Sequence, residues 1–264
     1  MQDRIWAGMH ELAATAGSGA AHRDTGNCGE ITVSDMGVPH PWGVNAVVGP
    51  GVPPAADLIE AIDWLASHDH GGGWRVSVPP QIQEAVAAMG GLAVVDSLPL
   101  FGMPAERADA LDRRVVPDLD ISPASSLEEV VASYGGWMSD DPLARLLVSP
   151  ADLADERREF LVASLNGTPI GCAFVWWMAG TGYLSGIGLL AQHRGRGYGR
   201  ALTTAAAARA AVGPVGGPTP DVIWMGATQS GASLYARMGF EQVDTEVRLG
   251  PTRAGRPRAR AGSP

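Results

Sequence analysis

The sequence predicts an α/β fold, built around a mixed sheet and arranged as two related halves. Three observations support this prediction: short apolar strand segments alternate with amphipathic helical segments, a glycine-rich loop joins a strand directly to a helix, and one strand–helix–strand unit recurs. The chain has 264 residues, of which 45% are hydrophobic and 18% are charged. That length and composition suit one large domain or two ordinary domains with buried cores.

The charged residues restrict the function. All 19 basic residues are arginines, which excludes mechanisms that need a catalytic lysine. The formal net charge is −9, and it becomes −13 without the four arginines of the last sixteen residues. Such an acidic body argues against nucleic-acid binding and favours a cationic or amine-bearing partner. Residues 251–264 are rich in arginine, glycine and proline, so we expect a disordered tail there.

The sequence predicts a cytoplasmic protein. No apolar run is long enough to cross a membrane, and the first residues lack the pattern of a secretory signal. The two cysteines, Cys28 and Cys172, cannot build a disulfide framework. A reducing compartment therefore fits best.

The first half is expected to form a domain over residues 1–112. Apolar periodicity predicts helices at 1–16, 55–66 and 81–89. It predicts strands at 31–33, 44–48, 74–78 and 92–95. Residues 97–112 contain Pro99 and Pro104, and we interpret this segment as a linker.

The second half is expected to form a domain over residues 113–250. The segment 125–129 contains the Ser-x-x-Glu spacing of a capping box, which predicts a helix over 127–134. Asn166-Gly167 predicts the type I′ turn of a hairpin. The other expected elements are strands at 114–119, 159–165, 170–178, 183–190, 222–225 and 242–249, and helices at 142–148, 200–212 and 231–238.

The two halves contain a similar unit, which predicts a duplication. Each unit runs from a strand through a helix that ends in Ala-x-Met-Gly to a strand that ends in Val-Asp. Aligning Met89 with Met238 gives an offset of 149 residues, the length of an ordinary domain. A chance match of two strand–helix–strand units is the alternative, since such units are common.

A glycine-rich loop at 194–200 has the features of a pyrophosphate site. The N–H groups and dipole of a helix N-terminus favour an anion, glycines let the backbone approach it, and arginines add donors. The spacing differs from that of a dinucleotide-binding loop, and the lack of lysine excludes a P-loop. The residues predicted to bind the pyrophosphate are Arg194, Gly195, Arg196, Gly197, Tyr198, Gly199 and Arg200.

The pattern Arg194-x-x-Gly197-x-Gly199 resembles the coenzyme A loop of the GCN5-related N-acetyltransferase (GNAT) superfamily. A second segment, 234–240, reads Leu-Tyr-Ala-Arg-Met-Gly-Phe and resembles the tyrosine helix of that family. The resemblance spans residues 114–250 and implies a GNAT fold, acetyl-CoA or another acyl-CoA as cosubstrate, a small-molecule amine as acceptor, and no metal. Thr228 is a departure, because many relatives carry asparagine at this position.

The resemblance also implies roles for individual residues. Gly186 and Gly188 predict a bulge that parts two strands, so that the pantetheine arm would pair with the backbone at Ile187, Gly188 and Leu189. Tyr235 would protonate the departing thiolate as a general acid, and the alternative is a ring that fills the core. No general base is visible, because residues 161–191 contain no acid.

The first half lacks the residues that this chemistry needs. The segment equivalent to the glycine loop, 49–54, contains three prolines and no arginine, and Val86 stands in place of Tyr235. We therefore expect a degenerate, non-catalytic GNAT-like domain that packs on the active one.

Several other residues are candidates for metal binding, acceptor binding or catalysis. His68-Asp69-His70 has metal-like spacing but no second ligand cluster. One of Trp176 and Trp177 should face the core, and the other is a candidate to line an acceptor pocket. Cys172 is expected to be buried packing, and His193 a loop residue.

The predicted function is N-acyl transfer, with acetyl the expected acyl group, from acyl-CoA to the amine of a small molecule. One alternative keeps the fold but takes the acyl group from an acylated carrier protein or an aminoacyl-tRNA. Another alternative is a non-enzymatic protein that binds coenzyme A.

Overall fold

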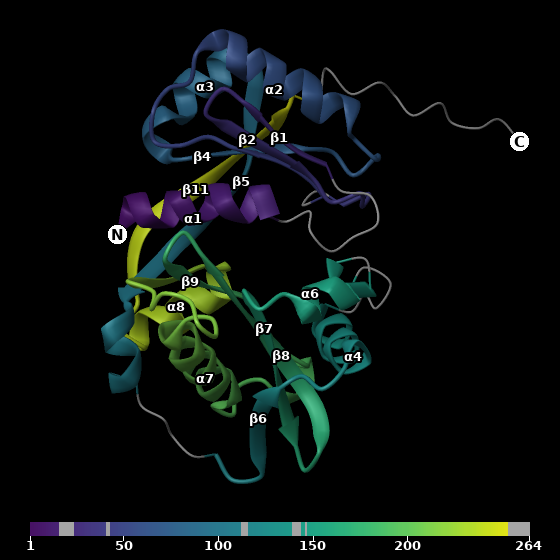
Figure 1. Ribbon diagram of the computed structural model, residues 1–264, viewed down its shortest axis with the longest axis vertical. Helices are drawn as coiled ribbons and strands as arrows, with labels where there is room; N and C mark the ends of the chain where they lie inside the picture. The colour runs from purple at the N-terminus through teal and green to yellow at the C-terminus, as the bar shows by residue number, and fades with distance from the viewer. Residues whose placement is uncertain (16–23, 41–42, 112–115, 139–143, 146, 253–264) are drawn as a thin grey trace, which may run out of the picture.

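The computed structural model describes the chain apart from residues 16–23, 41–42, 112–115, 139–143, 146 and 253–264. The described strands form one mixed sheet of eleven strands, in the order β1-β2-β3-β4-β11-β5-β10-β9-β8-β7-β6. The sheet passes through two lobes, and helix α1 lies between them (Figure 1). The predicted mixed α/β fold is confirmed.

The first lobe follows the predicted order of elements closely. Its strands are β1 (Asp24–Cys28), β2 (Ile31–Asp35), β3 (Val44–Val47) and β4 (Arg75–Val78). Its helices are α1 (Gln2–Thr15), α2 (Ala55–Ser67), α3 (Gln83–Gly90) and the short 3₁₀ helix η1 (Pro80–Ile82). Apolar residues at helical spacing, such as Leu58, Ala61 and Leu65 of α2, are fully buried against the sheet.

The second lobe contains the glycine loop and the tyrosine helix. Its elements are β6 (Leu119–Pro123), α4 (Leu127–Met138), α6 (Pro150–Ala154), β7 (Arg158–Leu165), β8 (Thr168–Met178), β9 (Thr181–Leu189), η3 (Ala191–His193), α7 (Tyr198–Val212), β10 (Val222–Gly226) and α8 (Gln229–Arg237). Glu129 N–H donates to Ser126 Oγ at 3.2 Å, as the capping box predicts. Asn166 and Gly167 have φ values of 50° and 76°, which confirms the predicted hairpin turn.

The predicted linker at 97–112 is wrong. Residues Leu92–Pro104 form one long strand, β5, and Ala105–Ala110 form a 3₁₀ helix, η2. Pro99 and Pro104 are tolerated in β5, and Pro99 still accepts a hydrogen bond through its carbonyl from the Ala227 N–H at 2.9 Å. A segment that reads as a proline-rich linker is therefore a central strand of the sheet.

Two other expected elements differ from the structure. The strand expected at 114–119 begins instead at Leu119, after Asp118 with a φ of 62°, and residues 112–115 are outside the described part. Of the helix expected at 142–148, residues 142, 143 and 146 are not described, whereas 144, 145 and 147 are helical and the Val148 N–H donates to the Ala144 carbonyl at 3.1 Å. A separate helix, α6, begins at Pro150, where Ser149 caps it. The predicted tail at 251–264 also lies almost wholly outside the described residues.

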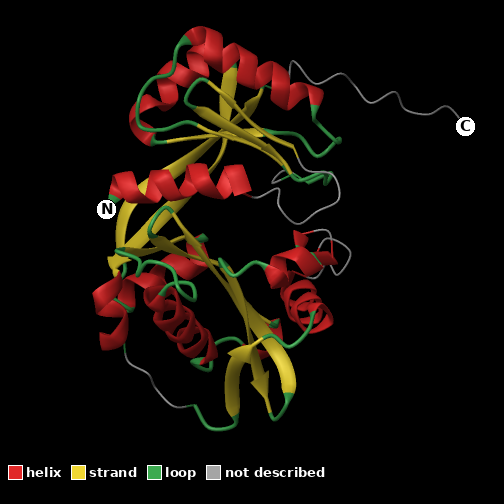
Figure 2. Cartoon of the chain, in the orientation of Figure 1, coloured by secondary structure: helices red, strands yellow, loops and turns green. Residues whose placement is uncertain are grey.

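The two lobes exchange their last strands. Strand β11 (Glu241–Pro251) lies between β4 and β5, and β5 lies between β11 and β10. Val247–Leu249 of β11 pair with β4 in the first lobe, whereas Leu100–Pro104 of β5 pair with β10 in the second. Figure 2, in which strands are yellow, shows these long strands passing from one lobe to the other.

The β5–β11 ladder supports the predicted duplication. Asp96 pairs with Arg248, and Pro99 pairs with Thr245. At the offset of 149 residues, Asp96 corresponds to Thr245 and Pro99 corresponds to Arg248, so each pair is the counterpart of the other. The outer pairs, Leu92 with Pro251 and Gly102 with Glu241, obey the same relation. The ladder therefore has a pseudo-two-fold axis at the offset predicted from the sequence.

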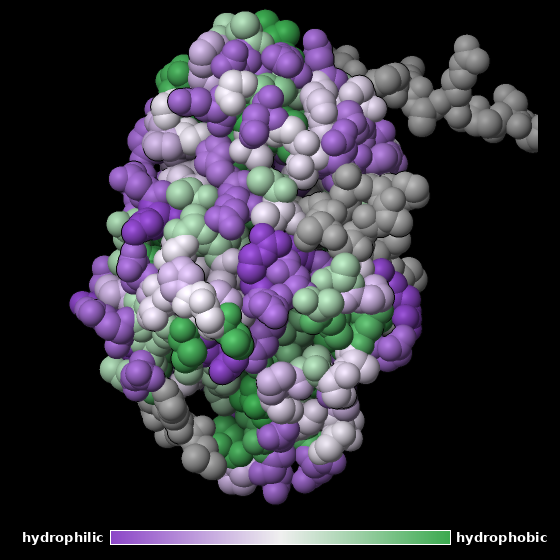
Figure 3. Space-filling view, viewed as in Figure 1, coloured by the Kyte–Doolittle hydropathy of each residue, from purple (hydrophilic) through white to green (hydrophobic). Residues whose placement is uncertain are grey.

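Helices cover both faces of the sheet. α7 and α8 pack on the side of Ile223 and Met225, and α2 and α3 continue on that side in the first lobe. α1 and α4 pack on the opposite side, where Trp224 and Phe174 lie. On the side drawn in Figure 3, hydrophobic residues gather mainly over the second lobe.

Because each lobe contains a strand of the other, we expect the whole chain to unfold in one transition. Leu100 is 1% exposed and lies on β5 between β10 and β11. Leu100→Ala should lower the free energy of unfolding by about 2–5 kcal/mol and move that single transition. Calorimetry measures both effects, with the exposed Val212→Ala as control. Two separate transitions, of which only one moves, would contradict the coupling.

Candidate active site

The strands β9 and β10 run side by side and then separate. They pair in parallel at only three positions, from Val222 with Thr181 to Trp224 with Tyr183. Beyond Tyr183, β9 continues for six residues to Leu189, while β10 stays paired with β5. The sheet thus has a slit between the two strands, as the paired glycines predicted.

A bulge in β9 causes the separation. Cys172 of β8 pairs with Gly188 and Phe174 pairs with Ser185, so two residues of β9, Gly186 and Ile187, lie opposite one residue of β8. Gly186 has a φ of 56°, which glycine adopts without the strain that a side chain would add. The extra residue bends β9 away from β10.

Gly188 is required for a different reason. A Cβ atom there would lie 2.2 Å from the indole ring of Trp137, which comes from α4. No local sequence pattern connects these residues, because 51 positions separate them and the contact depends on how α4 packs on the sheet. Trp137 therefore holds α4 against the bulge.

The backbone of Leu189 faces the slit. The N–H of the next residue, Leu190, donates to the Ile170 carbonyl at 2.8 Å, so the amide groups of Leu189 point the other way. On that side Arg194 Nε donates to the Leu189 carbonyl at 3.0 Å. Arg194 thus fixes the start of the glycine loop to the end of β9.

The glycine loop leads into α7 through two residues with positive φ. Gly195 and Gly197 have φ values of 76° and 88°, and a Cβ atom at either position would contact nothing within 4 Å. Glycine is therefore needed at both positions because of the backbone conformation, and not for lack of space. Gly197 is the N-cap of α7 and supplies no side-chain cap, so the first N–H groups of the helix remain available to an anion.

Tyr235 lies in the core on the α7 side of the sheet. It is 8% exposed, and its ring centroid is 6.4 Å from that of Phe101 and 6.3 Å from that of Phe240. Burial raises the pKa of Tyr235 to about 12, because desolvation disfavours the phenolate. In the described part of the chain, its hydroxyl has no hydrogen-bond partner.

Gly231 makes room for this ring. A Cβ atom at Gly231 would lie 2.9 Å from Tyr235 Cε2 and 3.4 Å from its hydroxyl oxygen. The phenol therefore lies back over the first turn of α8, which Thr228 caps by accepting from the Gly231 N–H at 3.3 Å. Thr228 thus supplies a cap at the position where the sequence departs from the resembled family.

Loop, strand and tyrosine helix meet at one place. A Cβ atom at Gly199, in the first turn of α7, would lie 3.7 Å from Leu189 Cδ1 and 3.9 Å from Leu234 Cδ2. Leu189 ends the bulged strand, and Leu234 precedes Tyr235 on α8. The structure therefore brings together the three segments that the sequence singled out.

A cavity of about 250 Å³ lies on the opposite face of the sheet. Ser185 and Gly226 line it, one from each side of the slit. Its floor comes from alternate residues of both lobes, and its other walls come from α1 and α4. The lining residues from eight neighbouring strands are Ser34, Asn45, Val47, Ser77, Glu246, Arg248, Leu98, Leu100, Trp224, Gly226, Tyr183, Ser185, Phe174 and Trp176.

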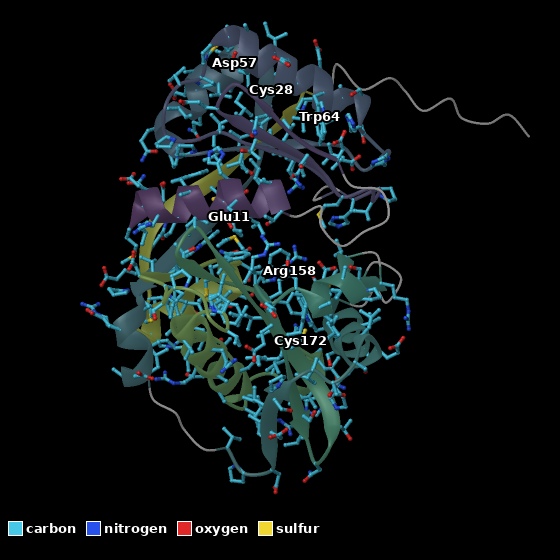
Figure 4. The ribbon with its side chains drawn as sticks, in the orientation of Figure 1. Glu11, Cys28, Asp57, Trp64, Arg158 and Cys172 are labelled. Carbon is cyan, nitrogen blue, oxygen red and sulfur yellow. The ribbon has the colours of Figure 1, made fainter. Side chains whose placement is uncertain are left out.

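The two tryptophans of β8 face opposite sides, as the strand period predicts. Trp177 is 6% exposed, lies in the core and donates from Nε1 to the Ala210 carbonyl at 3.0 Å. Trp176 lines the cavity, with the Arg158 guanidinium 4.1 Å from its ring centroid. Arg158 also pairs with Asp152 of α6 and donates to the Thr15 carbonyl, close to α1 and α6 (Figure 4).

The remaining candidates have structural roles. His70 Nε2 lies 2.8 Å from the Asp35 carboxylate, and His68 stacks on Trp64 with centroids 3.9 Å apart. In the ranges that the structure describes, no three potential ligands cluster as a metal site would need. Cys172 is fully buried, and burial raises its pKa to about 12, so its thiol is not a nucleophile at neutral pH.

The candidate site combines a bulged strand beside a slit, a glycine loop that opens a helix, and a buried tyrosine on the next helix. The family profile described as Acetyltransferase (GNAT) domain matches residues 156–242, which include the loop and Tyr235. This segment of the chain belongs to the GNAT superfamily. A comparison with the sequences of curated proteins finds no match.

Solved structures share the fold over both lobes. A GCN5-related N-acetyltransferase from Kribbella flavida aligns with a TM-score of 0.70 and 22% identity, covering 95% of each chain. A functionally unknown conserved protein from Staphylococcus epidermidis ATCC 12228 has a TM-score of 0.62 and 17% identity, with 91% of this chain and 98% of that one covered. A tandem GNAT protein from the clavulanic acid biosynthesis pathway has a TM-score of 0.59 and 17% identity, with 84% and 79% covered.

No helix in the described ranges combines the length and hydropathy that a membrane span requires.

The burial of the Tyr235 phenol predicts how the stability of the protein changes at high pH. The pKa of Tyr235 is raised to about 12, so the folded state holds this proton more tightly than the unfolded chain. The resulting stabilisation is complete below about pH 10 and is lost as the pH rises towards about 12. In urea titrations, wild type should lose stability faster than Tyr235→Phe over this range, by about 1.4 kcal/mol for each pH unit. Phe240→Leu, which keeps the phenol, should retain the steep slope, and equal slopes for wild type and Tyr235→Phe would contradict the assignment.

Proposed function

We propose that this protein is an N-acyltransferase that moves an acyl group, expected to be acetyl, from acyl-CoA to the amine of a small molecule. The observation that carries the proposal is the separation of β9 from β10 beyond Tyr183, with the glycine loop and Tyr235 on one face of the sheet and a cavity lined by Ser185 and Gly226 on the other. A thioester held in this slit would be reached by an amine from the cavity side.

The chain has suitable groups for the cosubstrate. The N–H groups at the start of α7 and the guanidinium groups of Arg196 and Arg200 would bind the pyrophosphate. Gly195, Gly197 and Gly199 leave space for it, and Tyr198 starts the helix. Main-chain groups at Ile187, Gly188 and Leu189 would pair with the pantetheine arm, in exchange for the Arg194 contact at the Leu189 carbonyl.

Acyl-CoA supplies a thioester carbonyl. The amine nitrogen bonds to that carbon and loses a proton, while the carbon–sulfur bond breaks and the sulfur gains a proton. The high pKa keeps Tyr235 protonated at neutral pH, so it can donate a hydrogen bond or its proton to the departing sulfur. No base needs to be assigned if the amine binds in its neutral form.

We also propose that residues 1–112 form a degenerate, non-catalytic domain and residues 113–250 the catalytic one, apart from the exchanged strands. In the first lobe, β3 ends where its pairing with β4 ends, so it offers no free edge like that of β9. Pro54 caps α2 without a side-chain hydrogen bond, and Val86 is fully buried. This domain would instead wall the acceptor cavity. A reducing cytoplasm is the proposed location, because both cysteines are free.

Acetyl-CoA should raise the melting temperature, since a ligand that binds the native state stabilises it. Arg196→Ala should weaken acetyl-CoA binding by roughly 10–100-fold, because a charge-assisted hydrogen bond contributes about 1.5–3 kcal/mol. Titration calorimetry gives the affinity, and Arg107→Ala, which removes an exposed arginine paired with Glu241, is the matched control. No binding at millimolar acetyl-CoA would overturn the proposed cosubstrate and favour a carrier-bound donor.

Tyr235→Phe should lower kcat by roughly 10²–10⁴-fold and leave the Kd of acetyl-CoA nearly unchanged. The hydroxyl is proposed to act on the sulfur in the transition state, so ground-state binding does not depend on it. Release of free thiol with a panel of amines measures turnover. An unchanged kcat removes the acid role, and cofactor binding without thiol release would support a non-enzymatic protein.

A further inference from the structure

The cavity has one charged pair in a mostly apolar wall. Of its described lining residues, Glu246 and Arg248 are the charged ones, and both come from the exchanged strand β11. Glu246 is 7% exposed, and a buried carboxylate is retained only where partners satisfy it. The pair therefore marks a point of the cavity that can recognise a polar group of the acceptor.

Glu246 has three donors and room for a fourth. Its Oε1 accepts from Ser77 Oγ at 2.5 Å and from Arg248 Nε at 2.9 Å, and its Oε2 accepts from Arg248 Nη2 at 2.8 Å. A carboxylate accepts about four hydrogen bonds, so one site is left on Oε2. Each nitrogen of the Arg248 guanidinium donates to a carboxylate, because its Nη1 also donates to Asp96 at 3.2 Å.

Aromatic rings line the cavity on both sides of the slit. The Tyr183 and Trp224 ring centroids are 4.2 Å apart, and the Tyr134 and Phe174 centroids are 4.8 Å apart. All four residues line the cavity, together with Trp176. Ring faces attract cations and cover apolar chains, so these rings suit an apolar spacer that ends in a positive charge.

The sheet fixes the distance between the carboxylate and the reacting centre. Glu246 is on β11, and the slit is between β10 and β9, so β5 and β10 lie between Glu246 and the slit. Neighbouring strands are about 4.8 Å apart, so about two and a half strand spacings, roughly 12 Å, separate Glu246 from the slit. One amine cannot occupy both places.

We propose that the acceptor is a diamine or a related molecule with two basic groups roughly 12 Å apart on an apolar spacer. One amine reacts at the slit, and the other stays protonated and binds the free site of Glu246. Arg248 and Ser77 act as positioning residues that hold this carboxylate in place. The inference rests on the proposed function, whose acceptor it specifies.

A series of amines that differ only at the far end tests this inference. The probes are 1,8-diaminooctane, octylamine and 8-aminooctanoate, which carry there an ammonium, a methyl and a carboxylate group. With acetyl-CoA as donor, we expect the diamine to show a KM at least tenfold below those for the other two probes. Equal values, or a preference for 8-aminooctanoate, would overturn the inference.

Glu246→Gln should remove this preference, raising the KM for the diamine at least tenfold while changing that for octylamine little. Glu241→Gln is the matched control, since it is the same change on the same strand at an exposed position. Ser77→Ala keeps the ion pair and provides a second test if Glu246→Gln does not fold, with a KM for the diamine about threefold higher. An unchanged KM in a folded Glu246→Gln variant would overturn the role of Glu246.

Binding without acetyl-CoA separates this inference from the proposed function. Titration calorimetry should detect binding of the diamine to wild type and a loss of that binding in Glu246→Gln. Diamine binding with no affinity for acetyl-CoA would reject the acyltransferase but keep the cation site. Acetyl-CoA turnover with no distinction among the three probes would keep the acyltransferase and reject the cation site.

Discussion

The exchange of β5 and β11 is the constraint on which the rest of the structure depends. Ten residue pairs join these two strands, and each strand also completes the sheet of the opposite lobe. Backbone pairing in the middle of a sheet cannot be given up without exposing unpaired N–H and C=O groups. The two lobes are therefore parts of one folded unit.

This constraint also creates the cavity. Because the sheet is continuous, side chains from β2 in the first lobe and β8 in the second project from the same face. Strand β11 brings Glu246 and Arg248 to the centre of that face, in a cavity that residues of α1 also line. A lobe that lacks the glycine loop, the free strand edge and the tyrosine can thus still contribute to the proposed acceptor site, through its half of the floor.

The two faces of the sheet on either side of the slit suit different kinds of molecule. On the α7 side, the helix N-terminus and the nearby Arg196 and Arg200 suit a phosphate-bearing molecule, and burial keeps Tyr235 protonated. On the α1 side, the aromatic rings and Glu246 suit an apolar molecule with a positive charge. The slit lies between the two sides, because the pairing of β9 with β10 ends at Tyr183, whereas β9 stays paired with β8 on both sides of the bulge at Gly186 and Ile187.

The local features of the fold could be predicted from the amino-acid sequence. Helix positions followed from apolar periodicity, the hairpin from Asn166-Gly167, and the loop from glycines that adopt positive φ values at Gly195 and Gly197. The duplication at an offset of 149 residues could also be read, because related units keep similar residues at similar spacing. These features depend on neighbours in the chain, so one-dimensional patterns reveal them.

The long-range features are visible only in the tertiary structure. The prolines of β5 predicted a linker, and nothing local signals that this segment pairs with β10 and β11 across the lobes. Glu246 reads as an ordinary polar residue of an alternating strand, and its place in the cavity depends on partners 169 positions away, such as Ser77. Contacts of this kind depend on strand order and helix packing, which a single sequence does not encode in any local pattern.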